Sequence, residues 1–296
     1  MSSTSRCGYV AIVGRPNVGK STLLNALIGT KISITSPKPQ TTRFQILGIK
    51  TQGSTQVVYI DTPGLHQNEK SAMNRYLNRL ASAVIPDADV ILFVVEALKW
   101  TEEDNFLLSK LKKTKAAVLL VINKIDTLGD KKELLPFLDT VKDKFSFTQI
   151  IPISATQAEN LSVLEQELEK YLPEGPALFP KEQITDKNSR FQIAEIVREK
   201  LIQATEQEIP YSTTVEVEDW KTEAKCIEIS VLIWVEREGQ KRIVIGKKGE
   251  RLKWIGIEAR KEIEALLKQK VFLRLWIKVK ERWTEDDRAR RQLGYD

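Results

Sequence analysis

Residues 14–21 read GRPNVGKS and fit the phosphate-binding pattern G-x-x-x-x-G-K-[ST]. The apolar run 9–13 (YVAIV) precedes this stretch, and leucines at helical spacing follow it over 21–28 (STLLNALI). A strand, a glycine-rich turn and a helix in this order predict a P-loop, whose backbone N–H groups and helix N-terminus face phosphate oxygens. We expect Lys20 to reach the β- and γ-phosphates and the Ser21 hydroxyl to bind Mg²⁺. The alternative is a chance match in a glycine-rich turn, which the flanking segments argue against.

The length and composition are those of a globular protein with two domains. The chain has 296 residues, 42% of them hydrophobic and 29% charged, and a net charge of +6. This charge permits a nucleic-acid or anionic-membrane partner. Its two cysteines, Cys7 and Cys226, lie far apart, which predicts neither a disulfide framework nor a zinc site. We find no signal peptide and no apolar run of membrane-spanning length, so we expect a cytoplasmic protein.

Residues 9 to about 172 alternate strand-like and helix-like segments. The runs 90–95 and 117–122 are continuously apolar, as in parallel strands covered on both faces. The pattern predicts an α/β domain with a mostly parallel sheet and helices on both faces, with ligand at the carboxyl ends of the strands. The expected strands are 9–13, 44–50, 57–61, 90–95, 117–122 and 148–153, and the expected helices are 21–28, 69–84, 102–112, 131–144 and 161–171.

Two further segments can respond to a γ-phosphate. Asp61 is the last residue of the predicted strand 57–61, and Thr-Pro-Gly follows it directly. At this point the Asp61 carboxylate can hold Mg²⁺ and the Gly64 N–H can meet the γ-phosphate. The alternative is an ordinary turn. The polar loop 33–43 can complete the Mg²⁺ coordination with a threonine, and we choose Thr42 over its neighbour. The alternative for this loop is a plain connector.

Residues 123–126 (NKID) follow the apolar strand 117–122 and indicate guanine recognition. Asp126 can accept two N–H bonds from guanine, and adenine lacks that donor pair, so an ATPase is disfavoured. The alternative is a helix N-cap by Asp126 or Asn123. The small residues 154–155 (SA) follow the next strand and leave room for backbone contact with the guanine carbonyl, although they also suit an ordinary loop.

Taken together, GRPNVGKS, TTR, DTPG, NKID and SA resemble the five G-motifs of translation-factor-class GTPases, and PNVGKS and QTTR are similar to the TrmE–Era–EngA group. This resemblance implies a GTPase that binds GTP, GDP and Mg²⁺. It assigns catalysis to Lys20, Thr42 and Gly64, and metal binding to Ser21, Thr42 and Asp61. The nucleotide-binding residues that it implies are Gly14, Arg15, Pro16, Asn17, Val18, Gly19, Lys20, Ser21, Asp61, Thr62, Pro63, Gly64, Leu65, Asn123, Lys124, Ile125, Asp126, Ser154 and Ala155.

The resemblance also carries departures that bear on hydrolysis. Leu65 stands where small GTPases such as Ras carry a water-orienting glutamine, so other groups must organise hydrolysis. The neighbouring His66 is either a base or an incidental loop residue, and we expect Arg43 to be a solvated loop arginine rather than a charge-stabilising finger. In related enzymes an asparagine at the position of Asn17 ligates K⁺.

The second half begins with a proline-rich segment, 173–180 (PEGPALFP), which reads as a linker. It is followed by a predicted helix, 190–208, and by a segment with uneven charge. Residues 201–240 carry 3 Lys and Arg against 9 Asp and Glu, whereas 241–280 carry 13 against 4. We expect strands at 211–218, 226–236 and 271–280, and a helix at 250–269.

Gly246, Lys247, Lys248 and Gly249 lie at the centre of the basic segment. A G-x-x-G between helical segments clamps the nucleic-acid backbone in KH domains, but alone it is usually a turn. This half resembles a type II KH domain of α+β class, and the stretches EREGQK, VIGKKG, IGIEARK and LRLWIKVK resemble the C-terminal half of Era-family proteins. The expected organisation is a G domain over 1–172, a linker over 173–189, a KH domain over 190–283 and a charged tail over 284–296.

The family resemblance implies that the protein binds small-subunit (16S-type) rRNA near its 3′ end and assists maturation of a 30S-type ribosomal subunit as a monomer. Two alternatives remain open: a non-catalytic RNA chaperone with a structural nucleotide, and a membrane-associated signalling GTPase on the inner face of the plasma membrane. Trp234 and Trp276 lie in predicted strands, so we expect them in the core. The tail arginines 288, 290 and 291 either contact RNA or are solvated.

Overall fold

The computed structural model describes residues 5–38, 40–65, 71–205 and 209–295. The chain divides into two compact units, Met1–Asp186 and Lys187–Asp296. No helix within the described ranges is long and apolar enough to cross a membrane.

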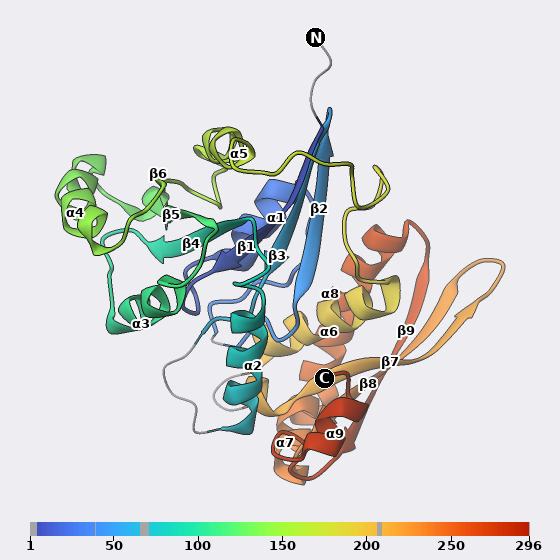
Figure 1. The fold of residues 1–296 in the computed structure, drawn as a ribbon. Coiled ribbons are helices and arrows are strands. Elements are labelled where there is room, and N and C mark those ends of the chain that lie inside the picture. The colour runs from blue at the N-terminus through green and yellow to red at the C-terminus, as the bar shows by residue number, and fades with distance from the viewer. Residues whose placement is uncertain (1–4, 39, 66–70, 206–208, 296) are drawn as a thin grey trace. The chain divides into compact units, whose positions relative to one another are not determined.

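The first unit is built on a six-stranded sheet with the order β2-β3-β1-β4-β5-β6 (Figure 1). β2 runs antiparallel to β3, and the other neighbours are parallel, which confirms the predicted sheet. The P-loop follows β1 in the middle of the sheet, and the other nucleotide motifs follow β3, β5 and β6. The strands are β1 (Arg6–Val13), β2 (Ile46–Gln52), β3 (Thr55–Asp61), β4 (Val90–Glu96), β5 (Ala117–Asn123) and β6 (Gln149–Pro152).

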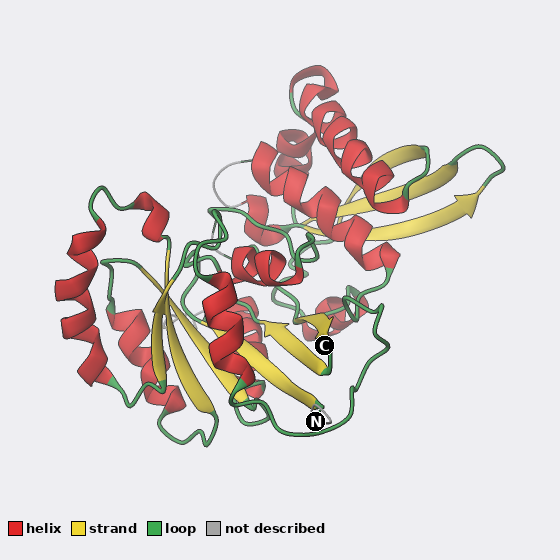
Figure 2. Cartoon of the chain, turned by 90° about the horizontal axis from the view of Figure 1, so that it is seen from above, coloured by secondary structure: helices red, strands yellow, loops and turns green. Residues whose placement is uncertain are grey.

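Helices cover both faces of this sheet (Figure 2). They are α1 (Lys20–Ile28), α2 (Ala72–Ala83), α3 (Glu102–Leu111), α4 (Leu134–Val141) and α5 (Leu161–Glu169). The helix predicted over 131–144 is shorter, because 3₁₀ turns flank α4 on both sides. The helix predicted over 69–84 begins at Ala72 after the N-cap Ser71, whose side chain accepts from the Asn74 N–H. Residues 69–70 of that prediction lie outside the described ranges.

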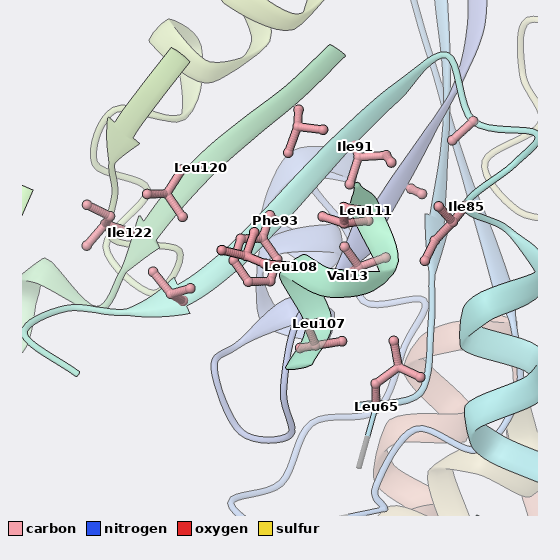
Figure 3. Close-up of a cluster of buried hydrophobic side chains, with 14 of the residues drawn as sticks. Val13, Leu65, Ile85, Ile91, Phe93, Leu107, Leu108, Leu111, Leu120 and Ile122 are labelled. Atoms are coloured by element: carbon pink, nitrogen blue, oxygen red, sulfur yellow. The ribbon is translucent and has the colours of Figure 1, made fainter. Parts of the chain in front are cut away.

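The core on one side of the sheet is a cluster of aliphatic side chains around Phe93 (Figure 3). Leu107, Leu108 and Leu111 of α3 pack onto it from the helix layer. Leu65 belongs to the same cluster and is buried. The loop that follows β3 is therefore held at this point by apolar burial.

The proline-rich segment 173–186 is bonded along the edge of the first sheet. Its Ile184 carbonyl accepts from the Ile49 N–H of β2 at 2.9 Å. The buried Gln56 side chain accepts from the Phe179 N–H at 2.9 Å and donates to the Phe179 carbonyl at 2.8 Å. We call this segment the strap, because ordered hydrogen bonds hold it onto the first unit.

The second unit has a three-stranded sheet with the order β7-β8-β9, in which β7–β8 are antiparallel and β8–β9 are parallel. α6 and α8 pack against one face of it, which gives the predicted α+β KH fold. The predicted helix 190–208 ends at Ala204, and α7 follows β8 where no helix was predicted. The elements are α6 (Ser189–Ala204), β7 (Thr214–Thr222), β8 (Ile227–Val235), α7 (Glu238–Ile245), α8 (Glu250–Leu267), β9 (Val271–Val279) and α9 (Asp287–Gln292).

The charged tail packs against the second unit. Trp283 is fully buried and donates its indole N–H to the Ser212 carbonyl at 3.0 Å. The Tyr295 ring packs against it with the ring centroids 5.5 Å apart and the ring planes tilted by 36°. Arg290 is also buried and donates to the Thr284 carbonyl at 2.6 Å, so it is unavailable to RNA. Arg288 and Arg291 remain exposed.

Candidate functional site

The P-loop backbone requires glycine where it approaches the guanine motif. Gly19 has φ of +96°, and a Cβ on it would lie 2.4 Å from the Asn123 side-chain nitrogen. α1 begins directly after it, at Lys20. The Lys20 ammonium donates to the carbonyls of Gly14 and Arg15, both at 3.0 Å. The lysine is thus folded back onto its own loop.

The predicted metal ligands lie together. The Ser21 Oγ donates to the Asp61 Oδ2 at 2.7 Å and lies 2.8 Å from the Thr42 Oγ1. Ser33, which the sequence did not single out, donates to the same carboxylate oxygen at 2.9 Å. The Asp61 Oδ1 is buried without a hydrogen-bond partner among the described residues. Two hydroxyls and a buried carboxylate with a spare oxygen are ligands that fit Mg²⁺.

Burial shifts both charged groups of this cluster toward neutrality. Burial lowers the pKa of Lys20 to about 8, and the Asp61 carboxylate only partly offsets this. Burial likewise raises the pKa of Asp61 above its usual value, against the Ser21 hydroxyl and Lys20. A bound Mg²⁺ and phosphate would supply the missing opposite charges on both sides. A cation beside Asp61 and an anion beside Lys20 would therefore favour the charged form of each group.

A cavity of about 540 Å³ opens over these residues. Thr41, which we did not choose as a metal ligand, donates to the Lys38 carbonyl at 2.6 Å. Gly64 lies against the P-loop, because a Cβ on it would come 2.7 Å from the Pro16 ring. The cavity is lined by Pro16, Asn17, Gly19, Lys20, Ser21, Thr22, Ile34, Thr35, Ser36, Pro37, Lys38, Gln40, Thr41, Thr42, Gly64 and Lys124.

The guanine motifs are bonded to one another and to the P-loop. The Asn123 amide donates to the Val18 carbonyl at 2.8 Å and accepts from the Ala155 N–H at 3.0 Å. The Ser154 hydroxyl donates to Asp126 at 2.6 Å. The short 3₁₀ turn at this point has no side-chain cap, so the alternative of a helix N-cap is wrong.

One residue that was not predicted, Glu96, connects the P-loop to the motif at 123–126. Glu96 ends β4 and pairs in register with Asn123 of β5. Its Oε2 lies 3.2 Å from the Arg15 guanidinium and 3.4 Å from the Lys124 ammonium. Burial raises the pKa of Glu96, but Lys124 and Arg15 outweigh it and leave the pKa below its usual value. Asp104 holds Arg15 from the other side at 3.4 Å.

Removing this charge should speed nucleotide release. In Glu96→Gln, we expect GDP to dissociate about fivefold faster, because two charge-assisted contacts between the P-loop and Lys124 are weakened. Stopped-flow release of fluorescent GDP measures this rate, and Glu102→Gln on the surface of α3 serves as the control. A release rate equal to that of the unaltered protein would contradict the joining role.

Two residues of the segments that were predicted to respond to the γ-phosphate differ from their expected settings, and a third is not described. Leu65 was placed in the nucleotide site, but its side chain is buried in the hydrophobic core, so only its backbone can face the nucleotide. Arg43 was expected to be solvated, yet its side chain is fully buried. His66 lies outside the described residues.

The G-x-x-G segment of the second unit joins α7 to α8. Gly246 has φ of +75°, and a Cβ on it would lie 2.7 Å from the Arg251 Cβ. Lys247 and Lys248 between the glycines are exposed. Beside this loop is a cavity of about 420 Å³, which the sequence did not predict because it forms between α8 and β9. Its lining consists of Gly249, Leu252, Lys253, Gly256, Ile257, Arg260, Phe272, Leu273 and Leu275.

Comparison with known proteins agrees with both sites. A family model described as 50S ribosome-binding GTPase matches residues 9–124, and a KH-domain model matches residues 208–284. A protein named GTPase Era from Pseudomonas fluorescens (strain Pf-5) is 53% identical, over 99% of this chain and 98% of its own. One from Pseudomonas aeruginosa (strain LESB58) is also 53% identical, over 98% of this chain and 95% of its own.

Solved structures extend the match to the whole fold. A crystal structure of Era in complex with MgGDPNP and nucleotides 1506–1542 of 16S ribosomal RNA has a TM-score of 0.95 and 43% identity, covering 98% of this chain and 99% of that one. An Aquifex aeolicus Era variant bound to GDP and AlF₄⁻ gives the same values. From its nucleotide motifs to its KH domain, this chain belongs to the Era family of GTPases.

Proposed function

We propose that this protein binds GTP with Mg²⁺ in the cavity of the first unit, hydrolyses it, and binds small-subunit rRNA through its KH domain. The observation that carries the proposal is the contact between Thr42 and Ser21 beside the buried Asp61 carboxylate. It brings the loop 33–43 onto the P-loop, where both can sense a triphosphate.

The chain's own residues divide the work. Lys20 exchanges its two carbonyl partners for phosphate oxygens and stays protonated beside them, while Asp126 accepts from the guanine edge. Gly64 offers its N–H to the γ-phosphate. Mg²⁺, held by Ser21, Thr42 and Asp61, would neutralise phosphate charge. Because a buried leucine stands in for the water-orienting glutamine, hydrolysis by the protein alone is expected to be slow.

On the RNA side, the G-x-x-G backbone approaches phosphates closely, and Lys247 and Lys248 neutralise them. The relative solved with nucleotides 1506–1542 of 16S ribosomal RNA points to the 3′ end of small-subunit rRNA. We propose that the protein acts in maturation of the small ribosomal subunit, in the cytoplasm and as a monomer.

Single-turnover GTP hydrolysis with and without a 3′-end rRNA fragment tests the proposal. RNA is expected to accelerate hydrolysis, and the double variant Lys247→Ala, Lys248→Ala is expected to lose that acceleration while keeping its basal rate. The matched control is Lys112→Ala, Lys113→Ala in the first unit. A hydrolysis rate that is the same with and without RNA would refute the coupling between RNA binding and hydrolysis. Absence of any turnover would favour a non-catalytic RNA chaperone.

Two further expectations concern a K⁺ ion at the nucleotide site and an anionic membrane as an alternative partner. Asn17 lies at the rim of the cavity with φ of +65°, and by family resemblance its amide can ligate K⁺. Hydrolysis should then be faster in KCl than in NaCl. The basic segment 241–280 could meet an anionic membrane instead of RNA, and flotation with anionic vesicles in the presence of competing RNA separates these partners.

A further inference from the structure

The edge strand of the KH sheet carries alternating aromatic and cationic side chains on its outer face. The odd-numbered residues of β9 pack into the core with α6 and α8. The even-numbered residues are exposed and form what we call the β9 row: Phe272, Arg274, Trp276 and Lys278. Trp276 is 55% exposed and Phe272 is 49% exposed. The expectation that Trp276 lies in the core is therefore wrong, because β9 is covered on one face only.

Neighbouring carboxylates fix the cations of the β9 row. Arg274 lies 4.8 Å over the Phe272 ring and 3.4 Å from Glu228 of β8. Lys278 lies 2.9 Å from Glu218 of β7. Because each cation has an acidic partner, the row contributes little net charge. What it offers to a ligand is flat aromatic surface.

Trp276 is the residue of the β9 row whose ring face is left uncovered by its neighbours. It pairs in register with Leu232 of β8, and it has neither an aromatic ring nor a cation against it among the described residues. Trp234 on the neighbouring strand differs, because its indole donates to Glu216 at 2.9 Å and Lys278 lies over its ring. An indole left with a free face in water is a stacking platform for a planar ligand.

The β9 row is continuous with the KH cavity. Phe272 lines that cavity together with Gly249 of the G-x-x-G loop and is also the first member of the row. β9 is an edge strand of its sheet, and in the described part of the chain no further strand lies beyond it (Figure 1). Four residues of strand place Trp276 about 13 Å beyond Phe272, the length of about four stacked nucleotides.

We propose that single-stranded RNA leaving the KH cavity crosses the β9 edge and stacks a base on Trp276. This inference rests on the proposed RNA-binding function and extends its binding site onto the outer face of the sheet. Every base has a π-face, so the contact adds affinity without reading sequence. It would lengthen the RNA segment that the protein protects beyond the four nucleotides typical of a KH clamp.

Fluorescence anisotropy with RNAs of two lengths tests the inference. The probes are a four-nucleotide RNA from the rRNA 3′ end and the same RNA extended by four nucleotides at the 5′ or 3′ side. Trp276→Ala is expected to weaken binding of one extended RNA about tenfold and to leave the short RNA unaffected. The salt dependence should not change, because no phosphate contact is lost. Trp276→Phe should recover most of the affinity.

The controls separate this inference from the proposed function. Trp254 of α8 is 43% exposed, and Trp254→Ala should leave the difference between the two RNAs intact. Equal affinities of the Trp276→Ala and unaltered proteins for both extended RNAs would overturn the inference, as would an equal loss for the short RNA. If the unaltered protein binds neither RNA, the proposed function itself fails. Unchanged thermal unfolding of Trp276→Ala is expected, since the ring is exposed.

Discussion

Replacing Asp126 with asparagine is expected to change the base preference of the protein from guanine to xanthine. The carboxylate can accept from both the ring N–H and the exocyclic amine of guanine, and Ser154 holds it by a 2.6 Å hydrogen bond. In the variant, the asparagine NH₂ group would face one of the two guanine N–H donors, and two donors cannot form a hydrogen bond. A site built to hydrogen-bond a group of its ligand rejects the analogue that leaves those hydrogen bonds unmade by a factor on the order of 10⁴. Xanthine carries a carbonyl at that position, so the asparagine amide can pair with it.

Titration of fluorescent GDP and XDP into both proteins measures this change. Asp130→Asn is the matched control, because Asp130 lies four residues further on and only caps a 3₁₀ turn by accepting from the Lys132 N–H. If Asp126→Asn kept its GDP affinity, Asp126 would not be the residue that reads the base.

The second large effect concerns stability. Lys20→Met is expected to stabilise the nucleotide-free protein at pH 7 by up to about 3 kcal/mol, because it removes a buried cation whose pKa is lowered from 10.5 to about 8. Between these two values the unfolded chain holds a proton that the folded chain has lost. The stability of the unaltered protein therefore rises through this window. The advantage of the variant should shrink from pH 8 upward and vanish above about pH 10.5.

Urea unfolding at several pH values without nucleotide gives the comparison, and Lys31→Met on the surface is the control. With GDP and Mg²⁺ added, the unaltered protein should become the more stable of the two, since only it gains the binding free energy of the ligand. A variant that is less stable at pH 7, or a gap that does not depend on pH, would contradict the argument.

The nucleotide motifs could be predicted because each is contiguous in the sequence and follows a strand that the apolar pattern marks. Glu96 could not, because its role depends on β4 lying beside both β1 and β5. An acidic residue at the end of an apolar run has no signal of its own. The buried setting of Leu65 was missed for a related reason, since the motif describes the backbone of its loop and not the core beneath it.

In the KH domain, too, the features that depend on contiguous residues could be predicted and those that depend on tertiary packing could not. The G-x-x-G loop was visible in the sequence, whereas its cavity needs α8 and β9 together. α7 was missed because its eight residues are fewer than the stretch over which helical periodicity can be recognised. Trp276 was misplaced because strand alternation shows which residues share a face but not whether that face is covered.

The strap ends on the sheet of the first unit, and the cap of α6 follows it almost at once. Its last anchor is Asp186, whose carboxylate accepts from the Leu47 N–H of β2 at 3.0 Å. Asn188 already caps α6 by accepting from the Phe191 N–H. Lys187 alone lies between the two anchors, and its carbonyl accepts from the Gln192 side chain of α6 at 3.0 Å. Within two residues, the chain therefore passes from a hydrogen bond to β2, the strand that follows the loop 33–43, to the cap of α6.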